Sequence, residues 1–116
     1  MTANETKSSI LQGTLDLMVL KTLEQLGPLH GYGIARRIEQ VSGNQVMLNQ
    51  GTIYASLVRL TQQKLIASEW GVSDNNRRAK FYEITERGQK QLAEESDAWW
   101  RLAGVIEAVL GPQDAD

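Results

Sequence analysis

Apolar residues recur with the period of an α-helix near the start of the chain. Leu15, Val19 and Leu23 are spaced four residues apart, which places them on one face of a helix over residues 14–25. A glycine and a proline follow at positions 27 and 28. Proline cannot continue the hydrogen-bond ladder of a helix, so we expect the helix to end there.

A second helix is predicted over residues 31–41, because Ile34, Ile38 and Val41 follow the helical step. It opens with a Gly-Tyr-Gly triplet that looks like the start of a dinucleotide-binding loop. The preceding strand and the third glycine of that motif are missing. The free N–H groups of this helix start can instead meet a phosphate, with Tyr32 as a hydroxyl donor. The alternative is that Tyr32 packs beneath the turn.

A third helical stretch, residues 49–65, has Asn49 as its predicted N-cap and carries two different faces. Its apolar face is formed by Ile53, Leu57 and Leu60. Its polar face offers hydroxyl, amide and guanidinium groups but no acid, and consists of Thr52, Ser56, Arg59 and Gln63. Such a face suits a DNA major groove, and two helices joined by a short turn form a helix-turn-helix. The alternative is an ordinary amphipathic helix with a solvated polar side.

The periodicity changes after residue 65, where β-branched and aromatic residues dominate. Residues 66–72 and 80–85 are predicted to form a β-hairpin around a turn-forming segment. Basic side chains lie at its tip, and Arg77, Arg78 and Lys80 could pair with phosphates. In a helix-turn-helix protein such a hairpin is a wing, and the alternative is a solvated hairpin tip. We expect the aromatic residues Trp70 and Phe81 to pack the hairpin onto the helices.

A final helix is predicted from Thr85, its N-cap, to about Leu110. Apolar residues form a seam along it at Leu92, Trp99, Leu102, Ile106 and Val109. The compact part of the chain is too small to cover this seam, so the expected partner is the same helix of a second subunit. The alternative is that the helix folds back onto the first helix. Trp99 could contribute packing or the wall of a site for planar apolar ligands.

Length and composition limit the classes of protein. The chain has 116 residues and no cysteine, which excludes disulfides, thiolate metal sites and a thiol nucleophile. Its N-terminus lacks the pattern of a signal peptide and no apolar run is long enough to cross a bilayer, so we expect a cytoplasmic protein. We expect four segments, namely a disordered stretch over 1–9, a winged helix-turn-helix over 10–85, a dimerisation helix over 86–110 and a tail over 111–116.

Charge is distributed unevenly along the chain. The formal net charge is −2, but residues 30–90 hold nine basic and five acidic side chains. A basic middle between acidic ends is typical of a domain whose centre faces nucleic acid. The single histidine, His30, precedes a predicted helix and is interpreted as a cap or surface residue. No metal-ligand cluster, phosphate loop or catalytic constellation is present, so we expect no cofactor, no metal and no enzyme activity.

Four separated motifs carry a resemblance to a known family. They are Gly-Tyr-Gly at 31–33, Gly-Thr-Ile-Tyr-Ala-Ser-Leu at 51–57, Asn-Asn-Arg-Arg-Ala-Lys-Phe-Tyr at 75–82 and Ile-Thr-Glu-Arg-Gly at 84–88. In this order they resemble the PadR family of bacterial transcriptional regulators. The single long helix at the end is similar to the compact subfamily.

The resemblance implies a mainly α, winged helix-turn-helix homodimer that binds a palindromic operator and usually represses. The residues that match the DNA-binding motifs, together with the neighbouring Gln50, are Tyr32, Gln50, Thr52, Tyr54, Ser56, Arg59, Asn76, Arg77, Arg78 and Lys80. Arg59 and Arg77 should then face the same duplex. Many relatives have proline where this chain has Ala55. Some compact members bind planar aromatic compounds between tryptophans of the last helix, and Trp99 matches that position.

A rival hypothesis is a winged-helix module that contacts another protein and binds no operator. Acids on the recognition face would indicate such a module, and the predicted face has none.

Overall fold

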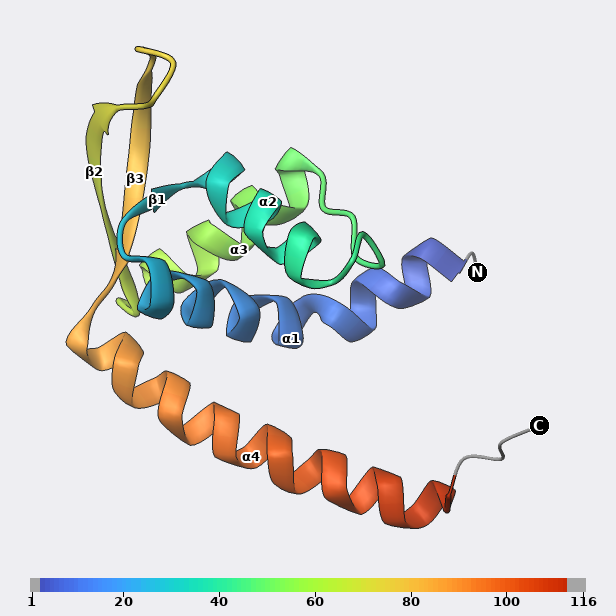
Figure 1. The fold of residues 1–116 in the computed structure, drawn as a ribbon. Helices are drawn as coiled ribbons and strands as arrows, with labels where there is room; N and C mark the ends of the chain where they lie inside the picture. The colour runs from blue at the N-terminus through green and yellow to red at the C-terminus, as the bar shows by residue number, and fades with distance from the viewer. Residues whose placement is uncertain (1–2, 113–116) are drawn as a thin grey trace.

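The computed structural model describes residues 3–112, and the side chains from residue 13 onward (Figure 1). Its elements are α1 (Ala3–Leu26), β1 (Leu29–His30), α2 (Gly31–Val41), α3 (Gln50–Gln62), β2 (Ile66–Val72), β3 (Arg78–Ile84) and α4 (Glu86–Leu110). The chain is 63% helical with one small antiparallel sheet, which confirms the predicted mainly α class. The molecule measures 51 × 30 × 26 Å along its principal axes.

Helix α1 is longer than the sequence pattern indicates. It begins at Ala3, within the stretch expected to be disordered over residues 1–9, and residues 1–2 lie outside the described part of the chain. The physical reason is that extending an existing helix adds a hydrogen bond per residue without a new nucleation cost. No proline interrupts this extension.

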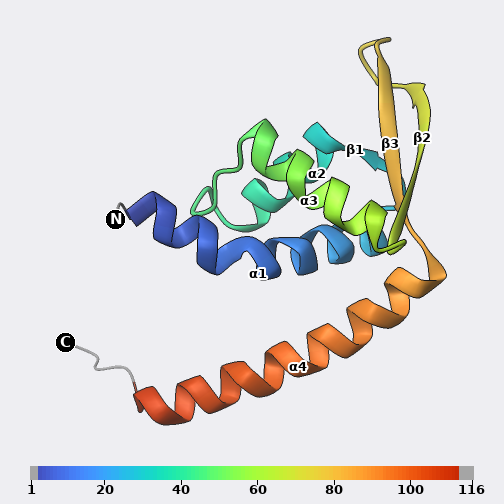
Figure 2. The same ribbon diagram turned by 180° about the vertical axis from the view of Figure 1, so that it is seen from behind.

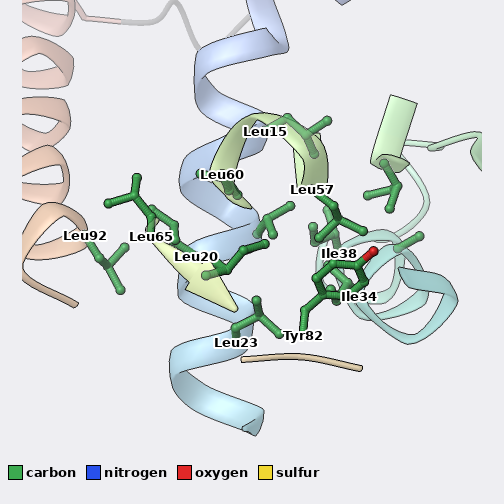
Figure 3. Packing of buried hydrophobic residues seen from close by; sticks show 14 residues of the cluster. Leu15, Leu20, Leu23, Ile34, Ile38, Leu57, Leu60, Leu65, Tyr82 and Leu92 are labelled. Atoms are coloured by element: carbon green, nitrogen blue, oxygen red, sulfur yellow. The ribbon is translucent and has the colours of Figure 1, made fainter. Parts of the chain in front are cut away.

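The core lies between α1, α2, α3 and the base of the sheet (Figure 3). Its members share apolar side chains that are almost fully excluded from solvent, and they are Leu15, Val19, Leu20, Leu23, Ile34, Ala35, Ile38, Ile53, Leu57, Leu60, Leu65, Ile66, Tyr82 and Leu92. The inward faces predicted for the three helices therefore meet, except at Val41, which is 70% exposed at the end of α2. Leu92 points from α4 toward Leu65 and Leu20 (Figure 3).

The sheet contains a strand that the sequence pattern did not predict. β1 pairs antiparallel with β3, with Leu29 opposite Tyr82, and the strand order is β1-β3-β2. A two-residue strand is too short to show any periodicity, and its pairing partner lies far away in the sequence. The hairpin β2–β3 extends beyond the helices (Figures 1 and 2).

Side-chain hydrogen bonds fix the turn between α2 and α3. The Ser42 hydroxyl accepts from the Val46 N–H at 3.1 Å. The Glu39 carboxylate accepts from the Leu48 N–H at 3.0 Å. Gly43 and Asn44 both have positive φ, which reverses the chain within a few residues. The second helix is therefore held at a defined angle to the first.

Helix α4 starts against the end of α3. The Thr85 hydroxyl accepts from the Gly88 N–H at 3.0 Å, which confirms the predicted N-cap, and donates to the Lys64 carbonyl at 2.8 Å. A methyl group at Gly88 would overlap the carbonyl oxygen of Leu65, so the approach requires glycine. From there α4 runs below α1, on the side away from the hairpin tip (Figures 1 and 2).

Candidate nucleic-acid interface

An open groove of about 960 Å³ lies between the N-terminal turns of α2 and α3 and one face of the hairpin. Its polar and charged lining comes from three elements that are distant in sequence, and comprises His30, Tyr32, Arg36, Gln50, Tyr54, Ser73, Asp74, Asn75, Arg77, Arg78, Lys80 and Tyr82. Four of these side chains are cationic and one, Asp74, is acidic. The groove therefore has a net positive charge although the whole chain is acidic.

The start of α2 presents its aromatic side chain outward. His30 caps the helix, and its Nδ1 accepts from the Gly33 N–H at 3.0 Å. A methyl group at Gly31 would lie 3.4 Å from Leu57, so glycine lets α2 begin close to α3. Tyr32 is 59% exposed, which excludes the alternative that it packs beneath the turn. Its hydroxyl can reach a ligand in the groove.

The start of α3 is capped as predicted. The Asn49 side chain accepts from the Thr52 N–H at 2.8 Å. Tyr54 is 65% exposed, and both Tyr54 and Gln50 line the groove. Thr52 is half-buried. The side of α3 that faces the groove is therefore the one that carries Gln50 and Tyr54.

The expected polar face of α3 is partly turned inward, which corrects two site assignments. Ser56 is fully buried, and its hydroxyl donates to Asp16 of α1 at 2.6 Å. Arg59 makes two hydrogen bonds to the same carboxylate, from Nη2 at 2.7 Å and from Nε at 3.0 Å. Neither residue lines the groove, so the structure does not bring Arg59 together with Arg77 there.

The physical reason is that α1 supplies an acid to a helix face that has none of its own. Hydrogen bonding to Asp16 raises the pKa of Arg59, and this effect exceeds the opposing effect of desolvation. The guanidinium is thus fully charged and already paired within the protein. The spacing of polar residues along α3 indicates which of them share a face. It does not indicate that an acid from α1 lies opposite that face.

The wing has the predicted basic tip, and its second strand begins at Arg78, two residues before the start predicted at residue 80. Val72 pairs with Arg78 and Trp70 with Lys80, and the turn is closed by the Ser73 N–H, which donates to the Arg77 carbonyl at 2.8 Å. Asn76 occupies the left-handed region with φ of 61°, a conformation that asparagine tolerates better than most residues. Arg77, Arg78 and Lys80 are exposed and line the groove, whereas Asn76 is exposed but does not line it.

The two aromatic residues of the hairpin have different surroundings. Phe81 meets the His30 ring edge-on at 5.5 Å between centroids, so its predicted packing role is confirmed. Trp70 is 56% exposed, so the same prediction is wrong for Trp70. Its ring lies 4.7 Å from the Arg78 guanidinium and 5.7 Å from the Lys80 ammonium.

One cation of the groove, Arg36, was not predicted from the sequence. It lies one helical turn after Tyr32 and lines the groove. The spacing of four residues was a usable signal for it.

The second half of α4 forms another exposed surface. Trp99, Leu102, Ile106 and Val109 are all exposed, and Trp99 meets Trp100 edge-to-face at 5.0 Å between centroids. Leu92 is instead buried in the core of its own chain, so its predicted place in an intersubunit seam is wrong. The first part of α4 therefore packs on its own chain, as the fold-back alternative predicts.

Two helices joined by a fixed turn, with a projecting β-hairpin beside the second helix, define a winged helix-turn-helix protein. The chain belongs to the transcriptional regulator PadR-like family, whose model matches residues 19–94. The resemblance noted in the sequence is thereby confirmed.

Known proteins of similar sequence and structure agree with this assignment. The chain is 30% identical over 105 residues to protein X of Lysinibacillus sphaericus, an uncharacterized protein, covering 90% of this chain and 94% of that one. It is similar to a transcriptional regulator of Thermoplasma acidophilum, with 29% identity, a TM-score of 0.76 and coverage of 91% and 99% of the two chains.

A third similar structure is Bacillus subtilis PadR in complex with operator DNA. Identity is 25% and the TM-score is 0.61, with 70% of this chain and 45% of that chain covered. Within residues 3–112, no helix has the length and apolar character needed to traverse a bilayer.

Proposed function

We propose that this PadR-like protein is a sequence-specific DNA-binding regulator that acts as a homodimer on a palindromic operator and represses transcription. The observation that carries the proposal is the groove, in which the N-terminal turns of α2 and α3 meet the cationic face of the wing. Cationic, amide and phenol groups line this groove and come from three separate elements. Such a spread of charged and hydrogen-bonding groups suits a DNA duplex better than a small ligand. The operator complex of the Bacillus subtilis relative supports the same kind of partner.

Each element has a separate role in this proposal. Arg77, Arg78 and Lys80 pair with phosphates, and this contact gives affinity that is independent of sequence. The N-terminal turn of α2, with Tyr32, holds a further phosphate. On α3, Gln50 and Tyr54 read base edges in the major groove. Thr52 and Asn76 do not line the groove but are adjacent in the chain to residues that do, and the proposed interface includes both.

The homodimer is proposed from the unpaired surface of α4. Trp99, Leu102, Ile106 and Val109 would pack on the same helix of a second subunit, since apolar side chains in this number are rarely left in water. Two grooves would then face one duplex. We expect half-sites roughly one DNA turn, or about 34 Å, apart.

A ligand site beside Trp99 is proposed as the means by which DNA binding is controlled. A hollow of about 360 Å³ lies along α4 and is lined by Trp99, Leu102, Ala103, Ile106, Glu107 and Leu110. Its mostly apolar wall suits a small planar aromatic effector. Such a compound should quench Trp99 fluorescence when titrated into the dimer, and Trp99→Ala should abolish its binding.

The DNA-binding proposal is tested by removing the wing cations. Arg77→Ala combined with Arg78→Ala should weaken binding to any duplex and reduce the slope of log affinity against log salt by about two, one for each phosphate contact. Gel shift and fluorescence anisotropy over a range of salt concentrations measure both quantities, starting with the DNA upstream of the protein's own gene.

A matched control is available on α4. Arg87→Ala with Lys90→Ala removes the same charge from exposed positions outside the groove, and should leave the salt slope unchanged. An equal fall for both double variants would contradict the wing assignment. Failure of the wild-type protein to bind any duplex would favour a protein–protein module instead.

A further inference from the structure

The side chains of Asp16, Ser56 and Arg59 form a polar cluster between α1 and α3, remote from the groove. Asp16 and Arg59 are largely buried, with 17% and 28% of their side chains exposed. One carboxylate of α1 accepts three hydrogen bonds from two residues of α3. Exposed ion pairs contribute little to stability, whereas a bidentate, partly buried pair with a third hydrogen bond is directional and well shielded.

The cluster lies on the side of α3 opposite the groove. Ser56 and Arg59 are three residues apart, so they share one face of the helix. Tyr54 precedes Ser56 by two residues, which places it about 200° around the helix axis. A rotation of α3 that broke the cluster would therefore also move Tyr54 and Gln50.

Small rotations are enough to disturb base recognition. Atoms on the outside of a helix lie about 6 Å from its axis, so a rotation of about 10° moves them by about 1 Å. A shift of that size breaks a hydrogen bond to a base edge. The apolar contacts of Ile53, Leu57 and Leu60 also hold α3, but hydrophobic contact is non-directional and resists rotation less.

We infer that Asp16 is a positioning residue for DNA recognition, because it fixes the rotation of α3 through Ser56 and Arg59 and so aims Gln50 and Tyr54 into the groove. The inference rests on the proposed DNA-binding function. It also assigns Arg59 a role inside the protein, where the sequence suggested a contact with the duplex. Asp16 and Arg59 thus act on selectivity and not on the general attraction for phosphates.

The test compares Asp16→Asn, Arg59→Met and the double variant on a footprinted operator and on a scrambled duplex of equal length. Each single variant should lower the ratio of operator to scrambled affinity by about tenfold, comparable to one mismatched base pair. The double variant should lose no more than either single variant, since both break the same cluster. The salt slope should stay unchanged in all three.

The two single substitutions change net charge in opposite directions, so an equal loss of selectivity cannot arise from charge alone. Glu24→Gln removes a negative charge from an exposed ion pair of α1 and should preserve selectivity. Thr22→Val removes a hydrogen bond within α1, from the Thr22 hydroxyl to the Met18 carbonyl, and should also preserve it. Thermal unfolding shows that each variant is folded at the assay temperature.

Arg59→Lys replaces Arg59→Met in the test if Arg59→Met does not fold. Lysine keeps the charge but cannot form the bidentate pair, so this variant should still lose selectivity. Unchanged selectivity in Asp16→Asn and Arg59→Lys would overturn the inference. So would a fall of the salt slope by about one in Arg59→Met, because Arg59 would then be a phosphate contact. A wild-type protein that does not discriminate the two duplexes would overturn the proposed function itself.

Discussion

The two long helices of this protein are nearly equal in length but are covered in different ways. α1 has 24 residues and α4 has 25, and both carry apolar residues at helical spacing. Leu15, Val19, Leu20 and Leu23 of α1 are buried in the core of their own chain. On α4, Gly88 and Leu92 are the buried residues, and the large apolar side chains from Trp99 onward are exposed.

An amphipathic pattern therefore predicts that one face of a helix is buried, but not whether its own chain or a second chain buries that face. α1 lies under α3 and the base of the sheet, so its own chain covers it (Figure 2). The second half of α4 extends past these elements. We expect a second subunit to cover the exposed apolar face of this half. Three predictions test the difference in how the two helices are covered.

The largest effect is expected from removing a core side chain of α1. Leu20→Ala should lower the free energy of unfolding by about 2–5 kcal/mol at every protein concentration, because it leaves a cavity in the core. Trp99→Ala should change the unfolding of the monomer little, but should raise the dissociation constant of the dimer about tenfold or more. Urea unfolding and sedimentation over a range of concentrations measure these effects.

The contrast fails if Trp99→Ala destabilises the dilute protein as much as Leu20→Ala does. In that case the second half of α4 would be covered by its own chain. Sedimentation of the wild-type protein as a monomer at all concentrations would remove the proposed dimer.

An intermediate effect is expected from the two glycines of α4. Gly88→Ala should destabilise the fold by about 1–3 kcal/mol, because the added methyl group overlaps the Leu65 carbonyl. Gly104→Ala should stabilise the helix by about 0.5–1 kcal/mol, since no atom lies within 4 Å of the added methyl and alanine favours helix. Thermal unfolding measures both effects, and we expect a lower Tm for Gly88→Ala and a higher Tm for Gly104→Ala. Destabilisation of the dimer by Gly104→Ala would place a close helix contact at that position.

The smallest effect is expected in the pH dependence of the unfolding free energy, through Tyr82 in the core that the chain covers by itself. Burial raises the pKa of Tyr82, and the charge of Tyr54 adds to the shift. The folded state therefore favours the neutral phenol, so this contribution to stability is present below about pH 10 and is lost as pH rises through the raised pKa. Tyr82→Phe should flatten the fall of the unfolding free energy above about pH 10, as measured by urea unfolding.

Tyr32→Phe is the matched control, because it removes a phenol hydroxyl from an exposed position and leaves Tyr82 and Tyr54 in place. The effect of Tyr82 should not depend on protein concentration, unlike that of Trp99. A pH dependence that persists unchanged in Tyr82→Phe would contradict this origin.

Local signals in the sequence predicted much of the architecture. The caps Asn49 and Thr85, the β-hairpin and the apolar faces of α2 and α3 all follow from interactions between residues close together in the chain. The wing cations were also found this way, because turn-forming residues place them at a hairpin tip. Each of these features depends on spacing or on short-range hydrogen bonds, and both can be read directly from residue order.

Contacts between distant segments decided the rest. Asp16 lies far from Ser56 and Arg59 in sequence, β1 is defined only by its pairing with β3, and Trp70 is exposed because no helix covers the hairpin where it lies. The spacing of polar residues on α3 determined that they share a face. Only the packing of α1 against that face decided that an acid would pair with its arginine, because a charge is neutralised by whatever the fold brings within hydrogen-bond distance.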